Sequence, residues 1–280
     1  MRKVIISLFM KLIPKNKFGD NVFAFLTFIY FHRRFPNGTS NLVDVLHRLK
    51  IDGTLYEPLR CFVSDKEYMK TYVRGTVGDK FTIPTIALLS SKSDVESFTA
   101  KERCIVKPCH SSGDVIFLEK GQKLSFKEIK HWLNHNYYEV SREANYRYLA
   151  KRIIVEPILY DNNNLNDYKF FFYNGHFLFL QIDVDRATEH KRSFYDRDFV
   201  FLNFSTKYPI SSKQEKPDNF AEMLSLATKL SSDFKGLIRI DLYTNGSNIK
   251  VGEITNCHGS AREKTIPAGK EVLLDEYIKD

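Results

Sequence analysis

The stretch "RIDLYTNGSNIKVGEITN", residues 239–256, has the pattern of two short strands joined by a turn that carries Gly and Asn. Because side chains alternate between the two faces of a strand, Arg239 and Asp241 share one face of the first strand, and Glu253 lies on one face of the second. Two carboxylates side by side on a half-buried sheet repel each other unless a cation lies between them. The hairpin therefore predicts a cation site wherever the turn brings both carboxylates to one face.

The length of this turn decides the register. A loop with an odd number of residues, such as 244–248, places Asp241 opposite Val251 and diagonal to Glu253. A loop with an even number places the two carboxylates on opposite faces, because a shift of one residue turns every side chain over. We expect the odd loop.

The composition is that of a globular protein with well-packed cores. The chain has 280 residues, of which 43% are hydrophobic, 27% charged and 14% aromatic, so it is long enough for one large domain or two to three lobes, and it is not disordered. Its four cysteines, Cys61, Cys104, Cys109 and Cys257, form no C-x-x-C pair. Such spacings suit neither a zinc site nor a disulfide framework, and they favour free thiols in a reducing cytoplasm.

The net charge of +8 is concentrated near the N-terminus, where residues 1–34 contain seven Lys and Arg side chains against Asp20 alone. The same segment contains the apolar run Val22–Phe31, which is too short to span a bilayer and lacks the cleavage site of a signal peptide. Two interpretations stay open: a buried helix of an N-terminal lobe, or a basic apolar surface that touches the anionic inner membrane. Both place the protein in the cytoplasm.

The remaining sequence alternates helical and strand patterns. We expect helices over 65–74 (with Ser64 as N-cap), 125–149 (with a Ser125–Glu128 capping box) and 219–234, strands over 81–89 and 152–160, a strand–turn–strand over 104–120, and a hairpin over 167–186 that turns at Asn174–Gly175. This pattern predicts an α+β protein with antiparallel hairpins and covering helices.

Lys107 ends an apolar strand just before a turn that contains Ser111, Ser112 and Gly113. Small residues in such a turn let backbone N–H groups approach phosphate oxygens, and a nearby lysine adds positive charge. The sequence has neither the P-loop motif nor the kinase motifs. Taken alone, this segment fits an ordinary surface hairpin as well.

Three further features suit a nucleotide. Lys66 stands at the start of a helix, and Glu156 closes a strand before Pro157, which leaves backbone groups free for an adenine edge. Lys169 and Arg186 flank the Asn174–Gly175 hairpin, and the alternative for Arg186 is an ion pair with Asp183 or Asp185.

Mg²⁺ is a hard cation that takes oxygen ligands at about 2.0–2.1 Å, commonly one or two carboxylates and substrate phosphates. Asp241 and Glu253 supply such carboxylates, and Thr255 or Asn256 supplies a third oxygen. Arg239 is placed to stabilise charge that develops in a transition state. The alternative is a structural salt-bridge cluster around this arginine.

His131 and His135 are one helical turn apart. With no third ligand near them in the sequence, we interpret them as surface or core histidines rather than as a metal site.

The order of these features resembles that of the ATP-grasp superfamily, and more specifically that of the TupA-like ATP-grasp family of polysaccharide biosynthesis. The resemblance covers roughly residues 60–260 and rests on the segments "DKEYMKTYVRGTVGDKFTIPTI", "IVKPCHSSGDVI", "RIIVEPIL", "DYKFFFYNG", "DVDR", "FYDRDF", "KPDNFAEMLSLATKLSSDF" and "IRIDLYTNGSNIKVGEIT". The sequence departs from the family pattern in two places. The loop 109–113 has one glycine fewer than the usual N-H-G-S-G, and Thr255 stands where the family has Asn.

The resemblance implies an ATP-grasp fold, in which two α+β lobes grip ATP between antiparallel sheets. It also implies a division into a basic helical segment 1–60, an N-terminal subdomain 61–103, a lid subdomain 104–160 that carries the phosphate loop, and a C-terminal subdomain 161–280 that carries the Mg²⁺ site.

The resemblance also implies residue roles. Those in contact with ATP are Lys66, Lys107, His110, Ser111, Ser112, Gly113, Glu156, Pro157, Ile158, Asp161 and Lys169, of which His110–Gly113 form a mobile phosphate loop and Glu156–Ile158 the adenine hinge. Lys169, Arg186 and Arg239 act on the transferred phosphate, and Asp241 and Glu253 hold Mg²⁺ with Thr255 or Asn256.

The implied function is that of an ATP- and Mg²⁺-dependent carboxylate–amine ligase that works through an acyl phosphate. Its partners are a small amino acid or amine and an acidic, uronic-acid-containing glycan of the bacterial surface, and nucleic acid is not among them. The alternatives are a glycosyltransferase or phosphotransferase of the same pathway, for which "DVD" at 183–185 is the candidate metal motif, and a non-catalytic basic membrane-binding module.

Overall fold

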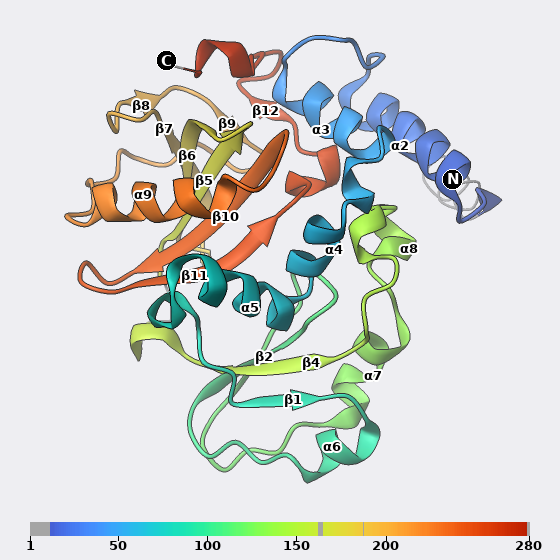
Figure 1. Ribbon diagram of the computed structural model, residues 1–280, viewed down its shortest axis with the longest axis vertical. Coiled ribbons are helices and arrows are strands. Elements are labelled where there is room, and N and C mark those ends of the chain that lie inside the picture. Colours follow the sequence, from blue (N-terminus) through green and yellow to red (C-terminus); the bar gives the residue numbers. More distant parts are fainter. Residues whose placement is uncertain (1–11, 162–164, 187, 279–280) are drawn as a thin grey trace.

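The computed structural model describes residues 12–161, 165–186 and 188–278, which form two larger β-sheets, the two-stranded pair of β9 (Ser205–Thr206) and β12 (Thr265–Ile266), and surrounding helices (Figure 1). The helices are α2 (Lys17–His32), α3 (Leu42–Ile51), α4 (Pro58–Ser64), α5 (Lys66–Val77), α6 (Lys92–Ser97), α7 (Phe126–Asn134), α8 (Tyr138–Ser141) and α9 (Phe220–Ser231). The strands are β1 (Ala87–Leu89), β2 (Cys104–Pro108), β3 (Ile116–Leu118), β4 (Ile153–Pro157), β5 (Asp167–Tyr173), β6 (His176–Val184), β7 (Lys191–Tyr195), β8 (Phe201–Leu202), β9 (Ser205–Thr206), β10 (Leu237–Thr244), β11 (Ile249–Thr255) and β12 (Thr265–Ile266).

The large sheet has six antiparallel strands in the order β11-β10-β5-β6-β7-β8. The predicted turn between β5 and β6 is confirmed, since Asn174 and Gly175 both have positive φ, 49° and 81°. Alternation along β5 sends Phe170 and Phe172 into a core with α5 and α9, while Phe171 joins a second core with α3 on the other face. The large sheet is therefore covered on both sides, and the polar ends of its strands are left for the site.

The small sheet has the order β1-β4-β2-β3 and lies below the large one in the view of Figure 1. The strand–turn–strand expected over 104–120 is confirmed by the antiparallel pair β2 and β3. The strand expected over 81–89 is confirmed only at its end, because a 3₁₀ turn occupies Asp79–Phe81 and pairing begins at Ala87.

The segment 61–103 contains the helix α5 and the strand β1. Its helix α5 packs on the large sheet, and its strand β1 pairs with β4 of the small sheet. This segment therefore contacts both sheets, and the N-terminal subdomain over 61–103 stays a prediction.

Both predicted helix caps differ from the observed ones. Asp65, rather than Ser64, caps α5, because its carboxylate accepts hydrogen bonds from the N–H groups of Glu67 and Tyr68. Ser64 belongs to the preceding helix α4, where its hydroxyl donates to the Arg60 carbonyl. Ser125 precedes α7 but makes no side-chain cap, so the predicted capping box is absent there.

The apolar run 22–31 lies in α2, which packs on α3 with Phe23, Ala24 and Phe28 buried. One face of this helix thus confirms the interpretation as a buried helix. The basic residues Arg2, Lys3 and Lys11 of the N-terminal segment lie outside the described residues. In the part of the chain that the structure describes, no helix is both long and apolar enough to cross a membrane.

Candidate active site

Asp241 and Glu253 lie directly opposite each other on β10 and β11. The odd turn was a wrong prediction, since the strands end with the pair Thr244 and Ile249 and leave an even loop over 245–248. A β-bulge restores the shared face, because the register shifts between Asp241 and Leu242. An extra residue in one strand offsets an even loop, so the two carboxylates still point the same way.

Gly252 is the extra residue of this bulge, since Leu242 pairs with Val251 and Asp241 with Glu253. A Cβ atom on Gly252 would come within 2.5 Å of Cε2 of the Tyr243 ring. The glycine therefore makes room for the ring that covers the bulge, and a larger side chain would disturb the register of Glu253.

Asp241 is buried and tightly held. Arg239 donates to both of its oxygens, each at 2.7 Å, and Lys169 Nζ lies 3.0 Å from Oδ2. Burial alone would raise the pKa of this carboxyl, but Arg239 and Lys169 outweigh burial and lower it. Asp241 is therefore ionised in the folded protein.

Glu253 is the open carboxylate of the pair. It is half-buried, and it makes no ion pair or hydrogen bond with any residue that the structure describes. An acceptor without a partner beside an ionised aspartate suits a divalent cation.

The two candidates for a third Mg²⁺ ligand, Thr255 and Asn256, point to opposite sides of the hairpin. Thr255 lies opposite Arg239 and accepts a hydrogen bond from its Nη2 at 2.9 Å. Asn256 faces the other way, as the next residue along a strand does, and its amide bonds Arg60 and Ser64. The structure therefore corrects the role expected of Asn256, which fixes Arg60 in the core, and it leaves Thr255 on the side of the carboxylates.

Within the described ranges, no group of three or more His, Cys, Asp or Glu side chains is arranged to hold a metal ion. Two facing carboxylates nevertheless fit Mg²⁺, which completes its shell with substrate phosphates and water.

Lys66 contacts the turn after β2. At the start of α5, its backbone N–H donates to the Cys109 carbonyl at 3.2 Å and its ammonium donates to the Ser111 carbonyl. Burial lowers the pKa of Lys66, while the charge of Glu253 acts to raise it. Lys66 is therefore within electrostatic reach of the hairpin carboxylates.

Lys107 on β2 pairs with Glu156 on β4, with Nζ 2.5 Å from Oε2. A second lysine, Lys70, lies 2.7 Å from Oε1 of the same carboxylate. Burial would raise the pKa of Glu156, but the two lysines outweigh burial and lower it. Sequence reasoning missed Lys70, although it lies one helical turn after Lys66 on α5 and so faces the same side.

The turn after β2 differs from the predicted mobile phosphate loop at its first residue. His110 is buried, with Nε2 2.9 Å from the Trp132 carbonyl and Nδ1 accepting from the Arg152 N–H at 3.3 Å. Since Nδ1 accepts, the proton is on Nε2 and the ring is neutral. The structure places His110 behind the turn as an anchor, whereas Ser112 and Gly113 are exposed.

The expected adenine hinge forms the end of β4. Pro157 lies opposite Cys104, and Ile158 leads into a short 3₁₀ turn, Leu159–Asp161. These residues continue the chain from β4 beyond Glu156. Their contact with adenine stays a prediction.

The cations expected to meet phosphate gather around Asp167. Arg186 Nη1 lies 2.8 Å from Asp167 Oδ2, and Lys169 also pairs with this carboxylate. The predicted pairing of Arg186 with Asp183 is not formed. Asp183 instead pairs with Arg192 at 2.7 Å, and it is buried.

A chain of polar contacts runs behind Arg239. Its Nη1 donates to His258 Nδ1, and His258 Nε2 lies 2.9 Å from Glu263 Oε2. Glu263 in turn lies 2.6 Å from Arg192 Nη1. Nothing in the sequence pointed to His258, Glu263 or Arg192, because their contact depends on the turn after β11.

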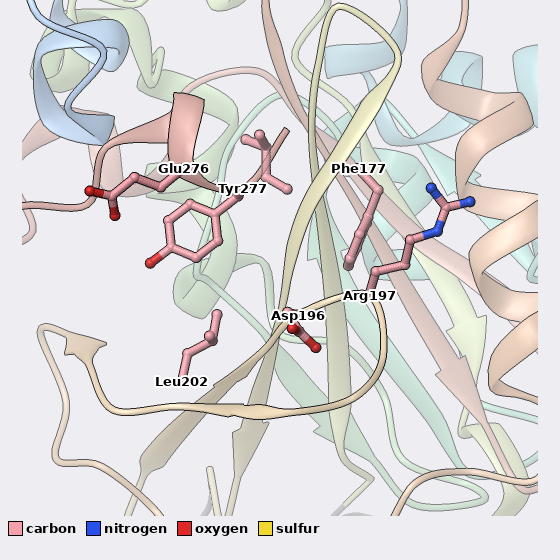
Figure 2. A pocket seen from close by; sticks show the side chains of 7 residues that line it. Phe177, Asp196, Arg197, Leu202, Glu276 and Tyr277 are labelled. Carbon is pink, nitrogen blue, oxygen red and sulfur yellow. The ribbon is translucent and has the colours of Figure 1, made fainter. Parts of the chain in front are cut away.

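Two pockets lie outside the hairpin. One of 180 Å³ is lined by Phe177, Leu178, Asp196, Arg197, Leu202, Glu276 and Tyr277, shown in Figure 2, and contains none of the predicted site residues. The other, of 240 Å³, lies beside the exposed turn, with Ser111, Ser112 and the pair His131 and His135 among its lining residues. The turn that carries the candidate phosphate contacts therefore also borders a space in which a substrate could lie.

The two sheets and the facing carboxylates agree with what the resemblance to the ATP-grasp superfamily implies. The family model for TupA-like ATP-grasp proteins matches residues 46–279, and the chain belongs to this family.

Three solved structures are similar in fold. D-alanine–D-alanine ligase from Helicobacter pylori is 17% identical, with a TM-score of 0.41 over 79% of this chain and 61% of that chain. N5-carboxyaminoimidazole synthetase from Staphylococcus aureus is 14% identical, with a TM-score of 0.42 over 73% of this chain and 48% of that chain. D-cycloserine synthetase DcsG is 14% identical, with a TM-score of 0.42 over 84% of this chain and 73% of that chain. The chain thus spans less than two thirds of the first two proteins, and no curated protein sequence matches it.

Proposed function

We propose that the protein is an ATP- and Mg²⁺-dependent ligase that joins a carboxylate to an amine. One observation carries this proposal: Asp241 and Glu253 face each other on β10 and β11, with Arg239 and Lys169 bonded to the first carboxylate and the second left open. An arrangement of two anions and several fixed cations suits the transfer of a phosphoryl group, whose charge is spread over several oxygens. The match to the TupA-like ATP-grasp family supports this class.

The reaction has two steps. A carboxylate oxygen of the substrate attacks the γ-phosphorus of ATP, the bond to the β–γ bridging oxygen breaks, and ADP leaves. The amine nitrogen then attacks the acyl carbon, phosphate leaves with the electrons of the C–O bond, and the nitrogen loses a proton to give the amide. Asp241 and Glu253 would hold Mg²⁺, which when bound would supply positive charge to the phosphate oxygens.

The residues of the chain position these groups. Lys66 contacts the Ser111 carbonyl in the turn after β2, and Lys107 pairs with Glu156 on β4. In this proposal both lysines meet the phosphates. Arg239 is held in one orientation by Asp241 and Thr255, so that little reorganisation is needed when charge develops. Arg186 is half exposed and contributes a cation from the end of the β6 strand.

The substrate carboxylate belongs, in this proposal, to a uronic-acid unit of an acidic bacterial surface glycan, or to an amino acid already joined to it. The amine is a small amino acid or a related amine. The net charge of +8 supports an acidic acceptor, as does the resemblance to a family of polysaccharide biosynthesis. Acting on such a glycan places the protein in the cytoplasm, in peripheral contact with the inner membrane.

The proposal is tested by incubating the protein with ATP, Mg²⁺, a panel of amino acids and uronic-acid-containing glycans. The expected result is release of ADP and phosphate that requires both a carboxylate and an amine. Release of AMP and pyrophosphate would contradict the acyl-phosphate route.

A further inference from the structure

Helix α2 has two apolar faces. The first, with Phe23, Ala24 and Phe28, is buried against the rest of the molecule. The second consists of Phe18, Val22, Phe25 and Ile29, which are spaced by four, three and four residues and therefore form one line along the helix. At 100° per residue this line lies on the side opposite to the buried face. A helix on the surface of a soluble domain ordinarily has polar residues there.

This second face is partly exposed, with Val22 and Ile29 half-buried. Phe18 is 74% exposed and Phe25 39%. Phe35, which follows the helix and is 71% exposed, stacks on Phe25 with ring centroids 6.1 Å apart, and Leu12 precedes the helix with 79% exposed. Phe18, Val22, Phe25, Ile29 and Phe35 make up the exposed stripe of α2.

The surroundings of the exposed stripe are positive. Between residues 12 and 40 the basic side chains are Lys15, Lys17, Arg33 and Arg34, and Asp20 is the one acidic side chain. Asp20 is buried on the other side of the helix, where it pairs with Arg142 at 3.0 Å and accepts from the Tyr138 hydroxyl. Lys15 pairs with the exposed Glu139 at 2.9 Å, and Arg34 pairs with Asp44. Lys17 and Arg33 are therefore the cations beside the exposed stripe that make no ion pair with a described residue.

The helix is fixed to the body of the protein. Besides its pair with Asp20, Arg142 donates to the carbonyls of Ile13 and Pro14, at 2.8 and 3.0 Å. Figure 1 shows α2 at the periphery of the molecule, with α3 on its inner side. A repacking that buried the exposed stripe would break these contacts, so the stripe faces outward.

We propose that the exposed stripe docks the protein on an anionic lipid bilayer. The helix lies parallel to the membrane plane, the aromatic rings enter the boundary between headgroups and acyl chains, and Lys17 and Arg33 meet anionic headgroups. A second copy of the chain is a poorer occupant, because it would bring the same cations together. An exposed aromatic stripe with a cationic border is instead typical of an interfacial helix.

The test is flotation of the full chain with vesicles of phosphatidylcholine that contain phosphatidylglycerol, compared with vesicles of phosphatidylcholine alone. We expect binding to the anionic vesicles that weakens as salt is added. The variant Phe18→Ser/Phe25→Ser/Phe35→Ser is expected to lose at least about tenfold in partitioning, because the transfer of each ring is lost. The matched control is Phe117→Ser, an exposed ring on β3 that is 49% exposed and belongs to the other sheet.

Three results would overturn the proposal: no binding of the wild type to anionic vesicles, equal binding to neutral ones, or undiminished binding of the triple variant. Analytical ultracentrifugation tests whether a second copy of the chain binds the stripe instead. A dimer that the triple variant abolishes would assign the stripe to a second copy. None of these residues belongs to the candidate active site, so ADP release in solution is expected to be unchanged in the triple variant.

Discussion

Arg239 and His258 are bonded directly, with Nη1 of the arginine donating to Nδ1 of the histidine. A guanidinium only donates hydrogen bonds, so Nδ1 holds a lone pair and the ring proton is on Nε2, which faces Glu263 at 2.9 Å. Burial lowers the pKa of His258, in keeping with a neutral ring. The histidine thus fixes the plane of the arginine that is proposed to stabilise the transition state.

We expect His258→Leu to lower kcat of ADP release by roughly 10- to 100-fold and to leave KM for ATP within about twofold, because a misplaced arginine acts on developing charge and not on ground-state binding. His258→Asn keeps an acceptor near the position of Nδ1 and is expected to recover most of the rate. A rise in KM alone, or equal losses in both variants, would show that His258 is structural only.

The ion pairs of the buried Glu156 with Lys70 and Lys107 predict how much stability is lost when one partner is removed. Lys70→Met removes one of its two partners and is expected to lower the free energy of unfolding by roughly 3 kcal/mol, since it leaves a buried carboxylate partly uncompensated. The control Lys92→Met breaks an exposed pair with Glu96 and is expected to cost less than about 1 kcal/mol. Urea denaturation measures both, and the double variant Lys70→Met/Glu156→Leu should cost less than the two single changes together.

The bulge at Gly252 tests how the two carboxylates are brought together. Gly252→Ala places a methyl group against the Tyr243 ring, and the overpacking is expected to cost about 1–3 kcal/mol of stability. It should also weaken the dependence of ADP release on Mg²⁺, because Glu253 moves with its neighbour. Gly38→Ala, which has open space around it, is the matched control. If ADP release by Gly252→Ala depended on Mg²⁺ as in the wild type, the bulge would not be needed to position the metal site.

The buried ring of His110 predicts a dependence of stability on pH. Burial lowers the pKa of His110 below its ordinary 6.5, so the unfolded chain takes up a proton at a pH where the folded protein does not. The free energy of unfolding should therefore fall as the pH falls below about 6.5, by up to about 1.4 kcal/mol per pH unit for this one group. In His110→Asn this part of the slope should disappear in chemical denaturation at several pH values. An unchanged slope would assign the acid sensitivity to other groups.

The sequence predicted the elements that carry the site because they have strong local patterns. The Asn174–Gly175 turn, the strand–turn–strand around Ser111 and the alternation of Arg239 and Asp241 are all set by neighbours in the chain. The family resemblance predicted from the sequence is confirmed by the match over residues 46–279.

What the sequence could not show depends on packing between distant segments. The Gly252 bulge brings the carboxylates to one face, which an even loop alone would not have done, and a side chain at this position would meet the Tyr243 ring. His110 was assigned to the phosphate turn, but Trp132 and Arg152, each more than twenty residues away, hold it behind the turn. Asn256 was a predicted Mg²⁺ ligand, but in the structure its amide oxygen accepts a hydrogen bond from Arg60.

The most direct test of the central claim, that the β10–β11 hairpin is the Mg²⁺–ATP site, is the rate of Mg²⁺-dependent ADP release by Glu253→Gln. Because Glu253 pairs with none of the described residues, the substitution should leave the unfolding transition unchanged. The predicted result is a loss of at least about 100-fold in the rate at a Mg²⁺ concentration that saturates the wild type, because one metal carboxylate is gone. A rate like that of the wild type would contradict the claim.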